Sequence, residues 1–497
     1  MSDKSSSDSS GGNASGEAAP AIGKDEWVAR SAEQRVVRSG PLAELEARLR
    51  RVPWWAWLAL LAGLVALLPV GFESGYVRRV AFDTVLYMLL ALGLNVVVGW
   101  GGLLDLGYVA FYGIGAYTYA LLGSDQYDIH VPTIGLIPLV VLIGAGVGFL
   151  VGLPSRRLEG DYLAIVTLFF LQIFLTLGTN GDDLFGLGNV TGGPNGLLRV
   201  DPLSFFGHAL PVETQGVFGV SYLYVVLGVF VVVYVALRFA NESRTGRAWR
   251  SLREDSLAAE VMGMPVNWLK LMSFAFGAAI AALTGTFLAA LSASVFPLSF
   301  SFPLLIIIYT MVILGGAGSQ AGVVLGAVLI GVLLELLRDP GDSRVLFYSV
   351  VVLGLLAAFR LSMRLAIVLG GLAVFGVVVH SIAGAVDGGW VNGSGGEGGG
   401  IADFAANWVI VPTDVAAWIA PASYISLVSL ALILTLLHGW VRIALLIPVL
   451  YLAAFVWENV MLSKPEPTRY IVLGVLLVAL MILRPTGLLG EKRVEII

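Results

Sequence analysis

Cysteine is absent from the sequence, and only four histidines occur among its 497 residues. The lack of cysteine excludes a disulfide framework and a thiolate metal site. The histidines are His130, His208, His380 and His438, which are far apart in the sequence and do not have the spacing of metal ligands. We therefore expect no metal centre and no cofactor in this chain.

Charged residues are also scarce. They make up 13% of the chain, whereas hydrophobic residues make up 58%. Soluble domains carry about 25% charged residues, so this chain is too apolar to be surrounded by water. The composition predicts a protein that lies in a lipid bilayer and has no nucleic acid among its partners.

A nucleotide-binding loop is absent as well, because no G-x-x-x-x-G-K-[ST] sequence occurs. The glycine-rich stretch 315–320 has no following lysine. It leads instead into Gly318, Gly322 and Gly326, whose spacing lets helix backbones approach closely. No cluster of acidic, histidine or lysine residues suggests a catalytic site. We expect a chain that is not an enzyme, so that another subunit hydrolyses ATP if transport uses it.

Apolar segments, by contrast, follow one another through most of the chain. A helix that crosses a bilayer needs about 20 residues, most of them apolar. Helices are predicted at residues 54–70, 80–100, 106–122, 131–151, 162–177, 217–237, 268–291, 303–314, 321–337, 345–359, 365–379, 425–437, 441–456 and 471–483. The predicted fold class is an all-α polytopic membrane protein with about 14 apolar spans. Several spans are short, as is typical of broken or re-entrant helices buried against protein.

The distribution of positive charge predicts the orientation of these spans. With a cytoplasmic N-terminus, most of the 29 lysine and arginine residues lie in cytoplasmic segments, chiefly the N-terminal tail and residues 238–270. This is the bias that the positive-inside rule describes. We therefore expect a cytoplasmic N-terminus and a cytoplasmic C-terminus, with Arg78 and Arg79 as the main exception.

Residues 1–40 have a different composition. They are rich in serine, glycine, alanine and charge, and they contain no apolar run. They lack the basic segment and the short hydrophobic core of a secretory signal. Because such a segment cannot bury enough apolar surface to fold, we expect a disordered cytoplasmic tail.

A charged segment at residues 238–270 contains a helical pattern. Its apolar and small residues recur at steps of three and four, at Trp249, Leu252, Ser256 and Ala259. This spacing predicts a short amphipathic helix, with Ser251 and Glu254 as a capping box. Gly263 followed by Pro265 predicts the end of the helix. Such a helix either docks in the groove of a partner or lies on the lipid surface.

Six stretches of the sequence together resemble one known family. They are 93–122 (GLNVVVGWGGLLDLGYVAFYGIGAYTYALL), 158–169 (LEGDYLAIVTLF), 189–197 (NVTGGPNGL), 243–264 (SRTGRAWRSLREDSLAAEVMGM), 313–329 (ILGGAGSQAGVVLGAVL) and 484–490 (RPTGLLG). In order and spacing they resemble the branched-chain amino-acid ABC transporter permease family, and within it the M-type subunit. The resemblance covers residues 75–360 and resumes at residue 469.

This resemblance implies a core of about ten membrane helices with a short, interrupted third span. It also implies a second homologous permease subunit, two cytoplasmic ATPase subunits that bind ATP, and an extracytoplasmic substrate-binding protein. The chain would then belong to an ATP-driven importer of branched-chain or related amino acids in the bacterial inner (plasma) membrane. In such an importer the helix within residues 238–270 couples the permease to an ATPase. The residues assigned to this coupling helix are Arg253, Glu254, Asp255, Ala258, Ala259, Glu260 and Gly263.

Polar residues and glycines in the second and third spans indicate a translocation pathway. Asn95, Gly99 and Gly102 interrupt these spans, and polar or irregular backbone is costly against lipid. The three residues therefore line either a pathway or a tight contact between helices. Asp105 follows at the cytoplasmic end, where we expect it to be solvated.

The stretch 189–197 has the composition of a tight turn. It contains Thr191, Gly192, Gly193 and Asn195, which we assign to the same pathway. The turn either guides substrate from a binding protein or has only a structural role.

One region departs from the family. Residues 361–468 carry additional apolar spans and a glycine-rich loop at 384–400, and segments 345–359 and 471–483 both resemble the final span of the family. We divide the chain into a disordered tail (1–40), a permease core (41–360) with the coupling loop 238–270, an inserted helical block (361–468) and a final family-like span (469–497).

Two alternatives stay open. A secondary transporter needs titratable residues at mid-membrane depth, and this chain has almost none. A permease for urea or short amides is the other alternative, because no residue of the sequence decides the substrate.

Overall fold

The structure is a computed structural model that describes residues 53–71, 75–124, 129–158, 160–181, 189–205, 208–210, 220–360, 362–391, 407–412, 418–462, 464–484 and 486–490. The chain divides into two units, Met1–Leu61 and Ala62–Ile497. Every element described below lies in the second unit, except that helix α3 (Trp54–Gly71) begins in the first. The tail predicted at 1–40 lies outside the described residues.

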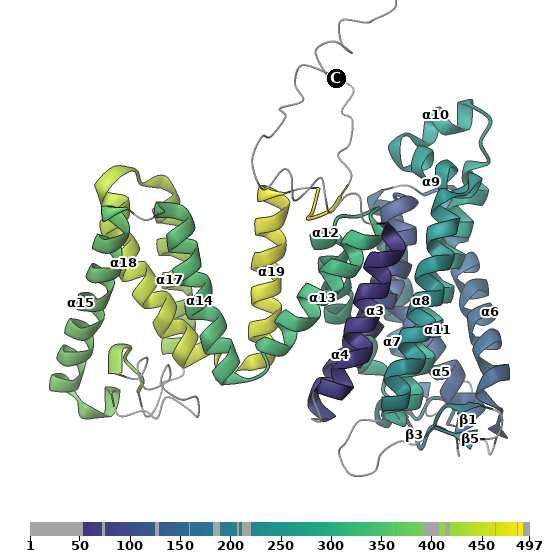
Figure 1. Cartoon of the computed structure of the whole chain (residues 1–497), viewed down its shortest axis with the longest axis horizontal. Coiled ribbons are helices and arrows are strands. Elements are labelled where there is room, and N and C mark those ends of the chain that lie inside the picture. The colour runs from purple at the N-terminus through teal and green to yellow at the C-terminus, as the bar shows by residue number, and fades with distance from the viewer. Residues whose placement is uncertain are drawn as a thin grey trace, which may run out of the picture. The chain divides into compact units, whose positions relative to one another are not determined.

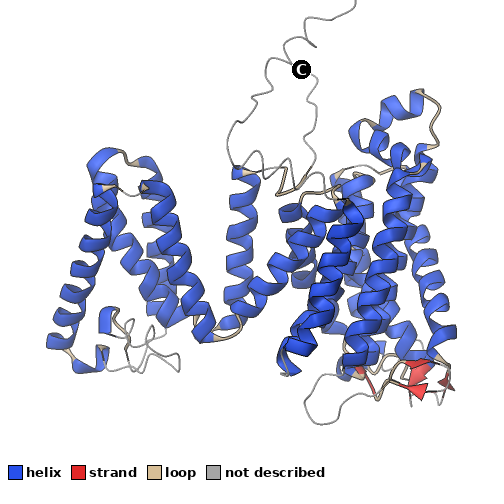
Figure 2. Ribbon diagram, in the orientation of Figure 1, coloured by secondary structure: helices blue, strands red, loops and turns tan. Residues whose placement is uncertain are grey.

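Helices dominate the described chain (Figure 2). After α3 come α4 (Gly75–Leu94), the π-helix η1 (Asn95–Trp100), α5 (Tyr108–Leu122), α6 (Thr133–Gly152), α7 (Asp161–Thr179), α8 (Val220–Glu242), α9 (Arg244–Glu254), α10 (Ser256–Val261), α11 (Val266–Ser292), α12 (Phe302–Gly315), α13 (Gln320–Leu336), α14 (Pro340–Phe359), α15 (Met363–Val386), α17 (Ile419–Leu436), α18 (Gly439–Val456), the π-helix η7 (Trp457–Met461) and α19 (Pro465–Leu483). Ten helical segments of the described chain are long and apolar enough to cross a membrane. The protein is therefore an all-α polytopic membrane protein, as predicted.

Every apolar segment predicted from the sequence coincides with one of these helices. Helix α5 has only 15 residues and α13 has 17, which is less than the roughly 20 residues of a full crossing. The short third span expected from the family resemblance is therefore present. The count of about 14 crossings and the cytoplasmic placement of both termini remain predictions.

Close backbone packing around α11 forms the core. Helix α11 packs against α4, α5 and α6. A Cβ atom on Gly115 of α5 would overlap the backbone of Ala282, and one on Gly285 of α11 would overlap the carbonyl oxygen of Tyr112. Because hydrophobic force between helices is weak in lipid, such close contacts between small residues are a main source of helix association.

Helices α12 and α13 form a second close pair. A Cβ atom on Gly322 would overlap the carbonyl oxygen of Gly315, and one on Gly326 would overlap that of Met311. Ser319 caps α13, since its hydroxyl accepts a hydrogen bond from the Gly322 N–H at 3.2 Å. The helix-packing role predicted for the glycine ridge is confirmed.

The C-terminal family-like span joins this pair. Helix α19 packs against α12, and the residues that follow it hydrogen-bond to the end of α12. The Leu488 N–H donates to the Leu314 carbonyl at 2.8 Å, and the Leu489 N–H donates to the Gly315 carbonyl at 3.0 Å. The RPTGLLG stretch is therefore an integral part of the α12–α13 region.

Helices α14, α15, α17 and α18 pack together as a helical block (Figure 1). Leu355, Leu365 and Val368 form one buried cluster where α14 meets α15. Trp408 and Tyr451 belong to a second cluster and pack edge to face, with ring centroids 5.6 Å apart.

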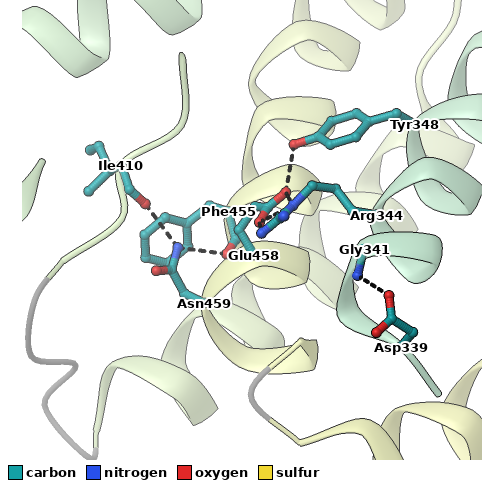
Figure 3. Close-up of polar contacts among 8 residues, drawn as sticks. All are labelled: Asp339, Gly341, Arg344, Tyr348, Ile410, Phe455, Glu458 and Asn459. Atoms are coloured by element: carbon teal, nitrogen blue, oxygen red, sulfur yellow. Dashed lines mark hydrogen bonds and ion pairs between the residues drawn. The ribbon is translucent and has the colours of Figure 1, made fainter. Parts of the chain in front are cut away.

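A buried ion pair joins α14 to η7 within this block (Figure 3). The Arg344 guanidinium donates from Nε and Nη2 to the Glu458 carboxylate at 2.9–3.0 Å, and both side chains are at most 4% exposed. The Tyr348 hydroxyl donates to the same carboxylate at 3.1 Å. Beside it, the Asn459 amide donates to the Ile410 carbonyl at 2.9 Å.

Short antiparallel strands of two residues each connect the loops between helices. The pairs are β1 (Gly123–Ser124) with β2 (Ile129–His130), β3 (Leu197–Leu198) with β6 (Ser294–Val295), and β4 (Ser204–Phe205) with β5 (His208–Ala209). They fix the loops that follow α5, α7 and α11 without adding a separate sheet domain.

Candidate functional site

The charged loop at 238–270 folds as two helices, α9 and α10, and not as the single helix predicted. Ser243 caps α9, because its hydroxyl accepts from the Gly246 N–H at 3.3 Å. Asp255 lies between the two helices in an extended conformation, with φ −154° and ψ 107°. Its carboxylate accepts from the N–H groups of Leu257 and Ala258, both at 2.9 Å. The predicted capping box at Ser251 is wrong, because Ser251 lies inside α9, where its hydroxyl donates to the Arg247 carbonyl at 3.2 Å, and Asp255 is the N-cap of α10.

The predicted end of the helix at Gly263 is confirmed. Gly263 has a φ of +82°, and its N–H donates to the Glu260 carbonyl at 2.9 Å. The Met264 N–H donates to the Ala259 carbonyl at 3.0 Å. This pair of bonds is a Schellman motif. Helix α10 is therefore capped at both ends, which gives a six-residue helix a defined shape.

The inner face of α9 is anchored on the membrane helices by Trp249. This side chain is 1% exposed, and its indole N–H donates to the Leu269 carbonyl of α11 at 2.9 Å. Its ring stacks on Trp100 of η1, with centroids 6.1 Å apart and planes 23° apart. Movement of α9 would therefore displace both α11 and η1.

The π-helix η1 in turn holds the loop between α12 and α13. The Asn95 side-chain oxygen accepts from the Gly318 N–H at 2.7 Å, and the Trp100 indole donates to the Gly318 carbonyl at 3.0 Å. A π-helix bonds residue i to residue i+5, which brings residues five apart, such as Asn95 and Trp100, to the same side. Gly318 has a φ of +96°, a conformation that favours glycine.

Arg253 at the end of α9 contacts the same loop. Its Nη1 donates to the Ala317 carbonyl at 3.3 Å. A Cβ atom on Gly102, which has a φ of +67°, would lie 3.1 Å from the Arg253 Cα. We call Asn95, Trp100, Trp249, Arg253 and Gly318 the loop–membrane junction. It joins residues from α9, η1 and the α12–α13 loop.

Two of the predicted pathway residues near this junction, Asn95 and Gly99, are packed against protein, whereas Gly102 is exposed. Asn95 is fully buried, and a Cβ atom on Gly99 would lie 2.6 Å from the Gly318 nitrogen. Their role in translocation remains a prediction.

Asp105 is also fully buried, contrary to the expectation that it is solvated. Its carboxylate accepts from the Gly107 N–H at 2.9 Å, and its carbonyl accepts from the Tyr309 hydroxyl at 2.7 Å. The loop between η1 and α5 is therefore packed against α12.

The outer face of α10 is apolar and exposed. Leu257 is 70% exposed, Val261 is 81% exposed and Met262 is 79% exposed. Of the residues assigned to the coupling helix, Ala258, Glu260 and Gly263 are exposed as well, whereas Ala259 is buried against this chain. The coupling-helix residues assigned from the sequence do not include these three large apolar residues, although Leu257 and Val261 lie beside the helical pattern. An exposed apolar patch of this kind is typical of a contact with a partner.

The turn predicted at 189–197 is present. The residues Gly193–Asn195 form a short 3-10 helix, and Gly192 and Gly196 have φ values of +76° and +64°. The Thr191 hydroxyl donates to the Gly178 carbonyl at 2.8 Å. The structural turn is thereby confirmed, and a role in guiding substrate remains a prediction.

A charged cavity of about 400 Å³ lies at the end of α4 opposite to η1. Its charged lining residues are Asp83, Glu335, Arg338, Glu466 and Arg469, from α4, α13, the loop after α13, and α19. Glu335 pairs with Arg338 at 3.5 Å. Within the described part of the chain, the buried Nε of Arg469 has no hydrogen-bond partner. Sequence reasoning gave Asp83 and Glu335 no role, because their convergence with α19 depends on the tertiary fold.

These features describe a polytopic membrane protein that has two short capped helices, α9 and α10, and a charged cavity lined by α4, α13 and α19. Residues 76–359 match the family model described as branched-chain amino acid transport system / permease component. This match covers more than half of the chain, so the chain belongs to that family.

Individual relatives agree with this assignment. The chain is 40% identical over 292 residues to the high-affinity branched-chain amino acid transport system permease protein LivM of Salmonella typhimurium. It is 28% identical over 289 residues to the probable LivM of Methanocaldococcus jannaschii, and 27% identical over 288 residues to the permease protein BraD of Pseudomonas aeruginosa. These matches cover 55%, 55% and 54% of this chain and 65%, 77% and 87% of the relatives. The chain thus matches less than two thirds of the length of the Salmonella relative. No solved structure is significantly similar to the chain.

Proposed function

We propose that this chain is a membrane-spanning permease subunit of an ATP-driven importer for branched-chain or related amino acids. Its family and the names of its relatives support amino-acid transport. The observation that carries ATP coupling is the combination of an exposed apolar helix, α10, with the loop–membrane junction behind it. A partner that binds α10 has a direct mechanical connection to the membrane helices.

The proposed complex contains a second homologous permease, two cytoplasmic ATPase subunits and an extracytoplasmic substrate-binding protein. ATP binds to the ATPase subunits, and this chain has no ATPase site of its own. The complex lies in the bacterial inner membrane, with both termini of this chain in the cytoplasm. In this orientation α10 faces the ATPases, and the charged cavity faces the binding protein.

Coupling proceeds through α9. The ATPase binds α10 through the exposed side chains of Leu257, Val261 and Met262. Helix α10 transmits movement as a rigid element because both of its ends are capped. Displacement of α9 moves the stacked pair of Trp249 and Trp100 and, through Gly318, the loop between α12 and α13. A switch between outward and inward access requires an element that adopts two discrete arrangements. In this proposal that element is the connected set of α9, η1 and the α12–α13 loop.

The charged cavity is the proposed entry of the substrate pathway. A free amino acid carries one ammonium and one carboxylate group. Asp83 and Glu335 offer acceptors for the ammonium, and the unpartnered Nε of Arg469 offers a donor for the carboxylate. Apolar residues such as Leu304 and Ile307 in the same lining accommodate an aliphatic side chain. A charge-assisted arrangement of this kind orients the substrate more than it tightens binding.

Copurification with the candidate ATPases tests the proposal. We expect the wild-type chain to retain the ATPases and the pair Glu260→Arg with Gly263→Trp to lose them. A second variant, Val261→Glu with Met262→Glu, changes only the exposed apolar face and should lose them too. Leu198→Glu is the matched control, because Leu198 is an exposed apolar residue of β3. ATPase retention by both α10 variants would contradict the proposal, provided that all chains insert equally.

A further inference from the structure

A second cavity lies within the helical block of α14, α15, α17 and α18. It has a volume of about 450 Å³, which falls in the range of about 300–1,000 Å³ that ligand sites occupy. Its wall is apolar along Leu355, Ile443 and Leu446, and it carries two cationic side chains, Arg364 and Arg442. It is separate from the loop–membrane junction and from the charged cavity, with which it shares no lining residue.

The positive charge in this cavity comes from Arg364 and Arg442, both of which are exposed residues. Among the described residues, no acidic side chain forms an ion pair with Arg364 or Arg442. The sequence explains why, because neither 355–368 nor 432–446 contains an aspartate or a glutamate. Arg344 in the same block is different, since it is buried and forms an ion pair with Glu458. Two arginines that have no acidic partner among the described residues, beside an apolar wall, fit a ligand with both an anionic group and an apolar part.

Two helix ends reinforce this charge. Helices α15 and α18 begin next to the lining arginines, at Met363 and Gly439, and neither has a side-chain cap. The first N–H groups of a helix carry partial positive charge, and no side chain caps them at these two ends. They add to the attraction for an anionic group, although the site rests on the arginines and the cavity.

We propose that this cavity binds an anionic phospholipid, with the headgroup phosphate between Arg364 and Arg442 and an acyl chain along Leu355 and Leu446. Arg favours phosphate because its planar guanidinium offers several donors. Trp440 lines the same cavity and is 67% exposed, as is typical of an indole at the membrane interface. Basic pockets between membrane helices are known to suit anionic lipid headgroups.

The lining distinguishes a lipid from a free phosphate. A soluble anion would gain nothing from the apolar wall, whereas a lipid uses both parts of the cavity. Leu432 and Leu436 of the adjoining α17 are 62% and 76% exposed, so the block presents an apolar surface along which an acyl chain continues. The inference does not depend on the proposed transport function, because α15, α17 and α18 lie outside the family match at 76–359.

The test compares phosphatidylglycerol with phosphatidylcholine of the same acyl chains, using the full chain purified in detergent and native mass spectrometry. We expect at least tenfold tighter binding of phosphatidylglycerol to the wild-type chain. The pair Arg364→Gln with Arg442→Gln should lose this preference. The pair Arg156→Gln with Arg157→Gln is the matched control, because it removes the same charge from two exposed arginines of another region and should keep the preference.

Four results would overturn the proposal. Equal binding of the two lipids by the wild-type chain would show that charge does not select the ligand. An equal loss in the Arg156 and Arg157 control would assign the effect to net charge alone. Competition by millimolar inorganic phosphate or by glycerophosphoglycerol would identify a free-phosphate site. The pair Arg364→Lys with Arg442→Lys should keep a preference for phosphatidylglycerol, and a folded lysine variant without one would also refute the site.

Discussion

Two side chains from the π-helix η1 form hydrogen bonds with the backbone of Gly318. Asn95 binds the N–H and Trp100 binds the carbonyl, while Trp100 also stacks on Trp249 of α9. A single glycine therefore connects three segments that are distant in sequence. Because a hydrogen bond contributes about 1 kcal/mol on average, each of these bonds is individually modest, and their value lies in fixing the relative positions of the segments.

Trp100→Phe tests this connection. The substitution keeps an aromatic ring against Trp249 but removes the donor to Gly318. We expect ATP-driven uptake by the assembled transporter to fall about fivefold, which corresponds to the loss of about 1 kcal/mol, with ATPase copurification unchanged. Trp268→Phe is the control, since Trp268 is 53% exposed. Wild-type uptake by Trp100→Phe would remove this bond from the coupling path.

The buried pair of Arg344 and Glu458 gives a prediction about stability. Removal of one partner from a buried pair costs about 3–5 kcal/mol, because the other charge is left without compensation. We expect Arg344→Met to lower the free energy of unfolding in detergent by about this amount, and Arg344→Met with Glu458→Met to recover most of it. Arg338→Met, at an exposed pair, should cost at most about 1 kcal/mol. Equal effects of Arg344→Met and Arg338→Met would contradict the prediction.

The sequence predicts that Asn95 lines either a pathway or a contact between helices, and in the structure this residue is fully buried. The sequence did not indicate Gly318 as the partner, because the two residues are 223 positions apart and only the packing of α4 against α12 and α13 brings them together. The same holds for Arg344 and Glu458, which are 114 positions apart. Local pattern indicates which residues need a partner, whereas the fold decides which partner they have.

The elements α9 and α10 owe their form to capping. A six-residue helix is too short to be stable alone, so α10 depends on Asp255 at its start and on the Schellman motif at its end. The end at Gly263 was predictable from the Gly-x-Pro pattern. The break at Asp255 was not, because the apolar periodicity continues through it from Trp249 to Ala259.

Asp255→Ala should loosen α10. The loss of an N-cap costs about 1 kcal/mol, so we expect hydrogen exchange of the amides at 257–262 to rise severalfold while the amides of α9 stay protected. Asp255→Asn keeps a capping oxygen and should behave as the wild-type chain. Unchanged exchange in Asp255→Ala would show that α10 is held by other contacts.

The arrangement of the whole chain shows how a helical block is accommodated in a permease of this family. The family match ends at residue 359, at the end of α14, yet the last family-like span is α19, which packs on α12. The sequence showed two candidates for the final span, and it could not decide between them because both have the same composition. The contacts of α19 and the RPTGLLG stretch with α12 favour α19 for the core position, and the division of the chain remains a prediction.

A deletion follows from this assignment. Arg338 and Glu466 line the same cavity, so the end of α13 and the start of α19 are close enough for a short glycine–serine linker to replace residues 341–463. We expect the shortened chain to keep ATPase copurification and to lose the binding of phosphatidylglycerol. A shortened chain that inserts but no longer retains ATPases would show that the block is part of the permease core.

The proposed function is decided by transport itself. The chain, reconstituted in liposomes with its second permease, its ATPases and its binding protein, is supplied with labelled leucine on the side of the binding protein. We predict uptake that requires ATP on the ATPase side and that stops in Val261→Glu with Met262→Glu. Uptake that needs an ion gradient and no ATP would contradict the proposal and identify a secondary transporter.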